Sequence, residues 1–80
     1  MKFYIEPPVI GNEIRDLYAQ MIWEKHKWQH MWFLRHLEDE INKEGGMLIL
    51  RGDNSIPKLE VIDFSPELVE KIESAVAKIG

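Results

Sequence analysis

The chain has 80 residues, 45% of them hydrophobic and 30% charged, a formal net charge of -4 at pH 7 and no cysteine. This length predicts a single domain over residues 1–80 with a small core, and the absence of thiols excludes disulfides, thiolate zinc sites and cysteine nucleophiles. Residues 1–11, 12–44 and 45–80 carry 1, 5 and 4 basic side chains against 1, 7 and 6 acidic ones, so no segment has the clustered cations on which nucleic-acid binding depends.

The first predicted element is a short strand at residues 2–6, KFYIE, which alternates apolar and other side chains. Two prolines end it, because neither supplies a backbone N–H to a neighbouring strand. Asn12 is a favourable N-cap, and residues 13–44 contain neither glycine nor proline, so the pattern predicts one long helix that ends at Gly45 and Gly46. At 1.5 Å per residue this helix would be roughly 48 Å long, against roughly 25 Å for a compact domain of this size. It must therefore kink, or project and be covered by something else.

The second half of the chain predicts two strands and a helix. Residues 47–51, MLILR, are a nearly continuous apolar run, which is typical of a strand covered on both faces. A turn segment at 52–57 leads into a second strand at 58–64, and the two strands form a hairpin. Ser65 then caps a helix that begins with proline and runs to the C-terminus. The order β-α-β-β-α predicts an α+β domain with a three-stranded sheet, one long aromatic-rich helix and one C-terminal amphipathic helix.

The long helix carries more apolar surface than one sheet can cover. At 100° per residue it shows two apolar faces beside a polar arc, whereas a helix lying on a single sheet needs only one stripe. We expect one face to pack on the chain's own sheet and second helix, and the other on a second copy of the chain, because most soluble oligomers are symmetric homo-oligomers. The alternative is a monomer whose hairpin and second helix cover both faces. The first face holds Ile14, Leu17, Tyr18, Met21, Trp28 and Trp32, and the second holds Ala19, Ile22, Trp23, Phe33, Leu34, Leu37 and Ile41.

We expect the interface between copies to use the large apolar residues of this helix. Tryptophan, tyrosine and methionine are enriched in interface cores, and burying one aromatic side chain removes roughly 150–250 Å² from water. The predicted interface residues are Tyr18, Met21, Ile22, Trp23, Trp28, Met31, Trp32, Phe33 and Leu37.

Two histidines on the long helix have the spacing of metal ligands. His26 and His30 stand four residues apart, so both imidazoles can meet one ion. Position 27 is lysine, not the glutamate of a catalytic zinc helix, and a complete metal site needs ligands from a second chain or from the C-terminal half. Histidines at the edge of an apolar face, without metal, are the simpler interpretation. If the pair lies in a helix interface, protonation near pH 6 weakens assembly.

Four carboxylates, Glu38, Asp39, Glu40 and Glu44, gather at the C-terminal end of the predicted long helix. Negative charge is mildly unfavourable there, so the cluster is either a solvated face or a contact for a basic partner. We treat these four residues as candidate partner-binding residues.

No motif predicts catalysis: there is no phosphate loop, no nucleophile elbow and no acid–base pair in a defined setting. The patterns together predict a small homo-oligomeric interaction module, an adaptor, regulator or inhibitor that binds an unidentified protein partner without a cofactor. A metal- or cofactor-binding protein centred on the two histidines is the alternative. Nucleic-acid binding, with tryptophans as stacking platforms, is a third, which the acidic balance disfavours.

Membrane association and secretion are not expected. No apolar run approaches the roughly 20 residues that span a bilayer, and the first residues, MKFYIEPPVIG, lack the apolar core of a signal peptide. The lack of cysteine also fits a reducing compartment, so we expect a cytoplasmic protein.

Overall fold

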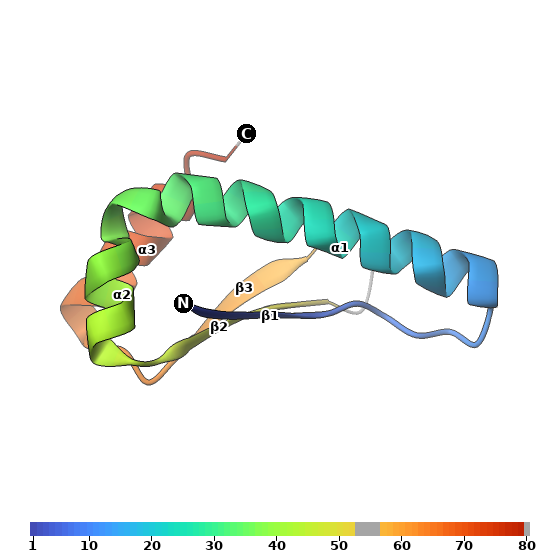
Figure 1. Ribbon diagram of the computed structural model, residues 1–80, viewed down its shortest axis with the longest axis horizontal. Helices are drawn as coiled ribbons and strands as arrows, with labels where there is room; N and C mark the ends of the chain where they lie inside the picture. The colour runs from blue at the N-terminus through green and yellow to red at the C-terminus, as the bar shows by residue number, and fades with distance from the viewer. Residues whose placement is uncertain (53–56, 80) are drawn as a thin grey trace.

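The computed structural model describes residues 1–52 and 57–79 (Figure 1). Residues 53–56, most of the turn expected at 52–57, lie outside the described residues. The order of the elements confirms the predicted β-α-β-β-α arrangement, a small α+β domain, with the long helical segment divided into two. The elements are β1 (Lys2–Glu6), α1 (Glu13–Leu34), a 3-10 helix (Arg35–Leu37), α2 (Glu38–Glu44), β2 (Met47–Arg51), β3 (Lys58–Ile62) and α3 (Pro66–Val76).

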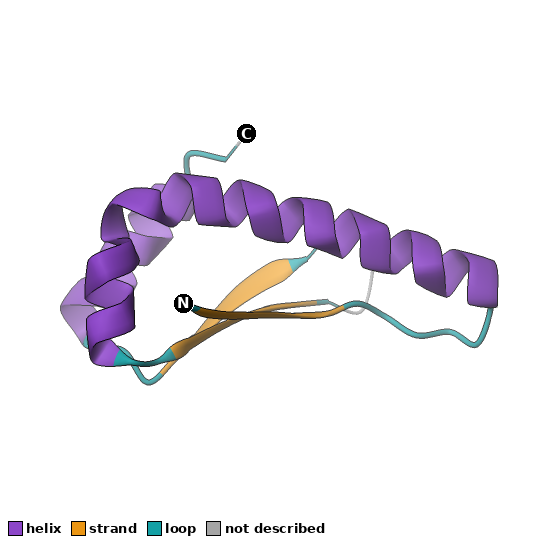
Figure 2. Ribbon diagram, in the orientation of Figure 1, coloured by secondary structure: helices purple, strands orange, loops and turns teal. Residues whose placement is uncertain are grey.

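The sheet has β2 at its centre, parallel to β1 and antiparallel to β3. The predicted hairpin of the second and third strands is therefore confirmed. Leu48 and Leu50 of β2 lie on the face that packs on the helices, and both are fully buried. Ile49 points to the other face, where its neighbours across the strands are Tyr4 and Glu60. It is 6% exposed although it lies outside the helix-packed core, and in Figure 2 no described helix lies below the strands.

The long helical segment spans residues 13–44 as predicted, and it kinks at Arg35–Leu37, which form a single turn of 3-10 helix between α1 and α2. Leu34 has φ of -97° and ψ of 0°, and Leu37 has φ of -107° and ψ of 2°, so both residues lie outside the α-helical region. The carbonyl oxygen of Trp32 accepts two hydrogen bonds from Arg35, one from its backbone N–H and one from its guanidinium at 2.7 Å. In Figure 1, α2 turns down across the end of the sheet, and so Leu34, Leu37 and Ile41 enter one core.

The first part of α1 projects beyond the sheet (Figure 1), in addition to the kink at the other end of the helix. The radius of gyration is 13.2 Å, whereas a compact chain of this length has about 11.6 Å. Two side chains hold the loop before the helix. Asn12 accepts a hydrogen bond from the Arg15 N–H at 3.1 Å, and the Asp16 carboxylate accepts from the N–H groups of Ile10 and Gly11 at 2.9 and 3.2 Å. The predicted N-cap is confirmed.

The core lies between α1, the inner face of the sheet and α3. Trp23 is its largest side chain and is 1% exposed. α3 begins as predicted, with Ser65 as N-cap and proline in the first turn. The other core residues are Phe3, Leu34, Leu37, Ile41, Leu48, Leu50, Leu68, Ile72 and Ala75.

The two glycines after α2 have different roles. Gly45 adopts the left-handed conformation, with φ of 77°, that ends a helix. Gly46 is buried, and a side chain there would overlap the carbonyl oxygens of Ile62 and Asp63, the second at 2.6 Å. The close approach of two backbones therefore requires a glycine at position 46.

Gly46→Ala is expected to lower the free energy of unfolding by about 1–3 kcal/mol, because the added methyl forces the ends of β2 and β3 apart. Gly45→Asn is the matched control, since asparagine tolerates the left-handed conformation and position 45 has open space around it. Urea unfolding followed by circular dichroism measures both. Equal midpoints for the two variants would contradict the assignment.

Candidate functional site

The outward side of α1 carries most of the exposed large apolar side chains of this helix. All six residues of the first predicted face are between 57% and 81% exposed, although each is a large apolar side chain. Exposed apolar patches of this extent are uncommon on monomers and mark interaction sites. We call this surface the outer stripe; its members are Ile14, Leu17, Tyr18, Met21, Trp28 and Trp32.

The inward side of α1 packs in the chain's own core. Trp23 and Leu37 are 1% and 5% exposed. They are therefore core residues and no longer count among the predicted interface residues. Ile22, Met31 and Phe33 are half-buried. The sequence-based set favoured large apolar residue types, whereas burial follows the position of a residue around the helix. Four of its members lie in the outer stripe: Tyr18, Met21, Trp28 and Trp32.

A cationic side chain lies over the ring of each exposed tryptophan. The Arg35 guanidinium lies 3.9 Å from the centre of the Trp32 ring, while its hydrogen bond to the Trp32 carbonyl fixes its position. Lys27 lies 5.9 Å from the Trp28 ring. Cation–π contacts at exposed positions contribute about 0.5–1 kcal/mol each. Arg35 was not among the predicted site residues, although an arginine three residues after a tryptophan in a helical segment is the signal for such a pair.

The two histidines lie on the inward side of α1, away from the outer stripe. His30 donates from Nδ1 to the carbonyl oxygen of His26 at 2.7 Å, and its ring meets Phe3 edge-on with 6.4 Å between ring centres. Burial lowers the pKa of His30 from its usual value, and the hydrogen bond to His26 only partly offsets this. Within residues 1–52 and 57–79, no cluster of three or more histidine, aspartate or glutamate side chains is arranged to hold a metal ion.

Because His30 lies on the inward side of α1, we expect its protonation to change the stability of the fold and not the assembly of copies. Because the pKa of His30 is lower in the folded state than its value of 6.5 in the unfolded state, the unfolded chain binds the proton more readily. The contribution of neutral His30 to the free energy of unfolding is complete above about pH 6.5, and it is lost as the pH falls from there to the pKa of His30 in the folded state. We expect the thermal midpoint to fall between pH 7 and pH 5, and to fall less in His30→Gln. An equal fall in both proteins would show that His30 is not responsible.

The acidic cluster proves to be divided between contacts within the chain and exposed positions. The Glu44 carboxylate accepts from the N–H and hydroxyl of Ser65 at 2.6 and 2.8 Å, which lowers its pKa. Glu40 pairs with Lys71 at 3.2 Å. Glu38 and Asp39 are exposed. Because the helix breaks at Arg35–Leu37, three of the four acids lie in the first turn of α2 and not at the C-terminal end of a helix. Negative charge is favourable in a first turn, so the cluster needs no partner to explain it.

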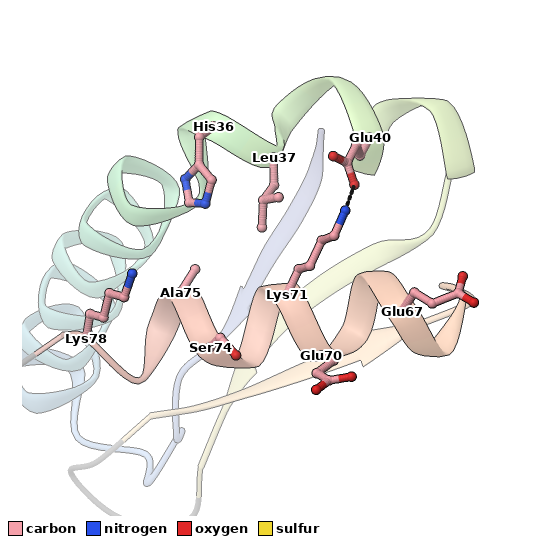
Figure 3. A pocket seen from close by; sticks show the side chains of 9 residues that line it. All are labelled: His36, Leu37, Glu40, Glu67, Glu70, Lys71, Ser74, Ala75 and Lys78. Atoms are coloured by element: carbon pink, nitrogen blue, oxygen red, sulfur yellow. Dashed lines mark hydrogen bonds and ion pairs between the residues drawn. The ribbon is translucent and has the colours of Figure 1, made fainter.

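An open groove of about 620 Å³ lies between α3 on one side and the 3-10 helix and α2 on the other (Figure 3). Lys71 crosses it to reach Glu40, and Glu70 points away from α2 in this view. The charges along the groove are mixed, and none of the side chains that line it is a buried polar group. The polar groups therefore do not converge on one point, as they do in a small-molecule site.

Contacts within the fold do not explain why the large apolar side chains of the outer stripe are exposed. In the part of the chain that the structure describes, no helix has both the length and the hydropathy to cross a bilayer. Comparisons of the chain with models of protein families, with curated proteins and with solved structures found no match.

Proposed function

We propose that this protein is a non-catalytic interaction module of the cytoplasm, which associates with another protein chain through the outer stripe and forms a homo-oligomer. The observation that carries the proposal is the exposure of six large apolar side chains on one helix face. The role of an adaptor, regulator or inhibitor of a further protein belongs to the same proposal. Contact with such a partner would use Glu38 and Asp39, which are exposed at the start of α2.

The area of the outer stripe supports the proposal. Its two tryptophans and its tyrosine are 62–64% exposed, so they leave roughly 300–450 Å² of aromatic surface in water. The three aliphatic members add roughly 130–250 Å². The sum is at or above the largest apolar patch of a typical monomer, and with its polar rim it approaches the roughly 800 Å² that one partner contributes to a standard interface.

The composition of the stripe also fits an interface. Tryptophan, tyrosine and methionine are over-represented in interface cores, and tryptophan and tyrosine are the residues whose truncation most often weakens a complex. The stripe lies on a regular helix, which presents these side chains with little loss of backbone freedom on binding.

The oligomeric state of matched tyrosine variants tests this function. Tyr18→Ser removes an aromatic ring from the outer stripe, and Tyr4→Ser removes one of similar exposure, 52% against 64%, from the open face of the sheet. Sedimentation equilibrium at micromolar concentrations is expected to show an oligomer for the wild type and for Tyr4→Ser, and a shift to monomer for Tyr18→Ser. A monomeric wild type, or an oligomer that only Tyr4→Ser disrupts, would overturn the proposal.

A further inference from the structure

We infer that the outer stripe pairs with the outer stripe of a second copy of the chain, with the two α1 helices antiparallel about a two-fold axis near their centres. This inference rests on the proposed function, and it adds the occupant of the stripe and its direction. Two copies related in this way present the same patch to each other, as a two-fold interface requires.

The spacing of the stripe is that of a coiled-coil seam. Positions 14, 18, 21, 25, 28 and 32 are separated alternately by four and three residues, 3.6 on average over these five steps, and this alternation keeps one row of side chains facing a second helix. Five of the six positions are apolar, and Lys25 is the exception. Leu17 lies at the border of the row. All six positions fall within α1, whose 22 residues run without interruption from Glu13 to Leu34.

Lys25 disfavours a parallel pair. In parallel helices each seam position faces its own copy, so two lysine ammonium groups would meet at the centre of an apolar interface. In antiparallel helices the first seam residue of one copy faces the last seam residue of the other. Ile14 then faces Trp32, Tyr18 faces Trp28, and Met21 faces Lys25. Each lysine then packs its aliphatic stem on a methionine and keeps its charge at the edge. All six seam positions are used in this register.

The charge of α1 is arranged along its length in a way that also favours the antiparallel pair. Within α1, residues 13–24 hold three acidic side chains and one basic one, and residues 25–34 hold two basic side chains and no acidic one; Arg35, the first residue of the 3-10 helix, adds a third basic side chain at that end. Antiparallel helices place each acidic half beside the basic half of the other copy, and they also oppose the two helix macrodipoles. Glu13 of one copy then lies near Arg35 of the other, on the same border of the seam.

Single cysteines distinguish the two directions, because the chain has no cysteine of its own. Glu24 borders the seam at its midpoint, so in an antiparallel pair its two copies lie beside the axis. The two copies of Ile14 lie about 27 Å apart along that pair, since 18 residues of helix separate positions 14 and 32. In a parallel pair the relation is reversed: the two copies of Ile14 face each other, and the two copies of Glu24 lie on opposite borders.

Under mild oxidation, Glu24→Cys is expected to form disulfide-linked dimers, and Ile14→Cys is expected to remain unlinked, at a concentration where both are dimers by sedimentation. Glu24→Cys removes no seam residue, and it removes the like charges that meet at the axis. Linkage of Ile14→Cys alone would overturn the antiparallel direction and leave the proposed function standing. A Glu24→Cys protein that does not link overturns the inference. If Tyr18→Ser also leaves the oligomer intact, or if the wild type is a monomer, then the proposed function fails with it.

Discussion

Trp28→Ala is expected to dissociate the oligomer while the chain stays folded. A central tryptophan of an interface contributes about 2 kcal/mol or more, and a two-fold pair loses it twice, so the dissociation constant should rise roughly a thousandfold. The fold should hardly respond, because Trp28 is 62% exposed and lies outside the core. Substitutions at such surface positions change the free energy of unfolding by about 0.5 kcal/mol or less.

Two measurements on the same sample separate the effects of Trp28→Ala. Sedimentation equilibrium gives the dissociation constant, and far-ultraviolet circular dichroism at a concentration where both proteins are monomers shows whether the fold is retained. An unchanged dissociation constant would mean that Trp28 is an isolated exposed ring and not part of an interface. A lost spectrum would mean that the outer stripe supports the fold itself.

Trp23→Ala is expected to have the opposite effect and to unfold a large fraction of the molecules. Trp23 is 1% exposed and is the largest fully buried side chain. Truncation of a buried tryptophan to alanine costs about 3–5 kcal/mol, which is comparable to the whole stability of a small domain, about 5–15 kcal/mol. Urea unfolding is expected to show a transition displaced to low denaturant or absent.

Trp23→Phe is the informative companion of this variant. The indole N–H of Trp23 is buried and has no hydrogen-bond partner in the described chain, and an unpaired buried donor costs about 1–3 kcal/mol. Phenylalanine loses some contact area but also removes that donor, so we expect a much smaller loss of stability than for alanine. Equal losses for the two variants would mean that the N–H is satisfied in solution, for example by an internal water molecule.

The local signals of the fold could be predicted because they act within a few residues of the chain. The first two strands, at residues 2–6 and 47–51, were predicted at the bounds they have in the structure. The two N-caps and the end of the helical segment at the glycine pair 45–46 were also predicted correctly, because capping depends on one residue and its nearest backbone groups. The third strand is shorter than expected, ending at Ile62, where Asp63 takes a positive φ of 62° and turns the chain toward α3.

The length of the predicted helix indicated that it must kink or project, but the position of the break could not be predicted, because no residue in it opposes a helix. Arg35, His36 and Leu37 are ordinary helix residues, and the bend arises where three leucine and isoleucine side chains on successive turns all reach the same core. Tertiary packing of this kind overrides local propensity. The position of the acidic residues changed with it, from the end of one helix to the start of another.

The candidate site was partly visible in the sequence, since the periodicity of the helix separated two apolar faces. Every residue of the first face is exposed in the structure, and Trp23, Leu34, Leu37 and Ile41 of the second are buried. Which face would turn inward, and which large residues belonged to it, depended on where the sheet lies against α1. That information is spread over three strands and is absent from the helix itself.

The most direct test of the central claim is the tryptophan fluorescence of Trp23→Phe as the protein concentration is raised. The chain has three tryptophans, and in this variant the two that remain, Trp28 and Trp32, both belong to the outer stripe. If a second chain covers the stripe, the emission maximum moves to shorter wavelength and acrylamide quenching weakens as the oligomer forms. Emission and quenching that stay the same from the monomer to the highest concentration would show that the stripe remains in water, and would contradict the proposed function.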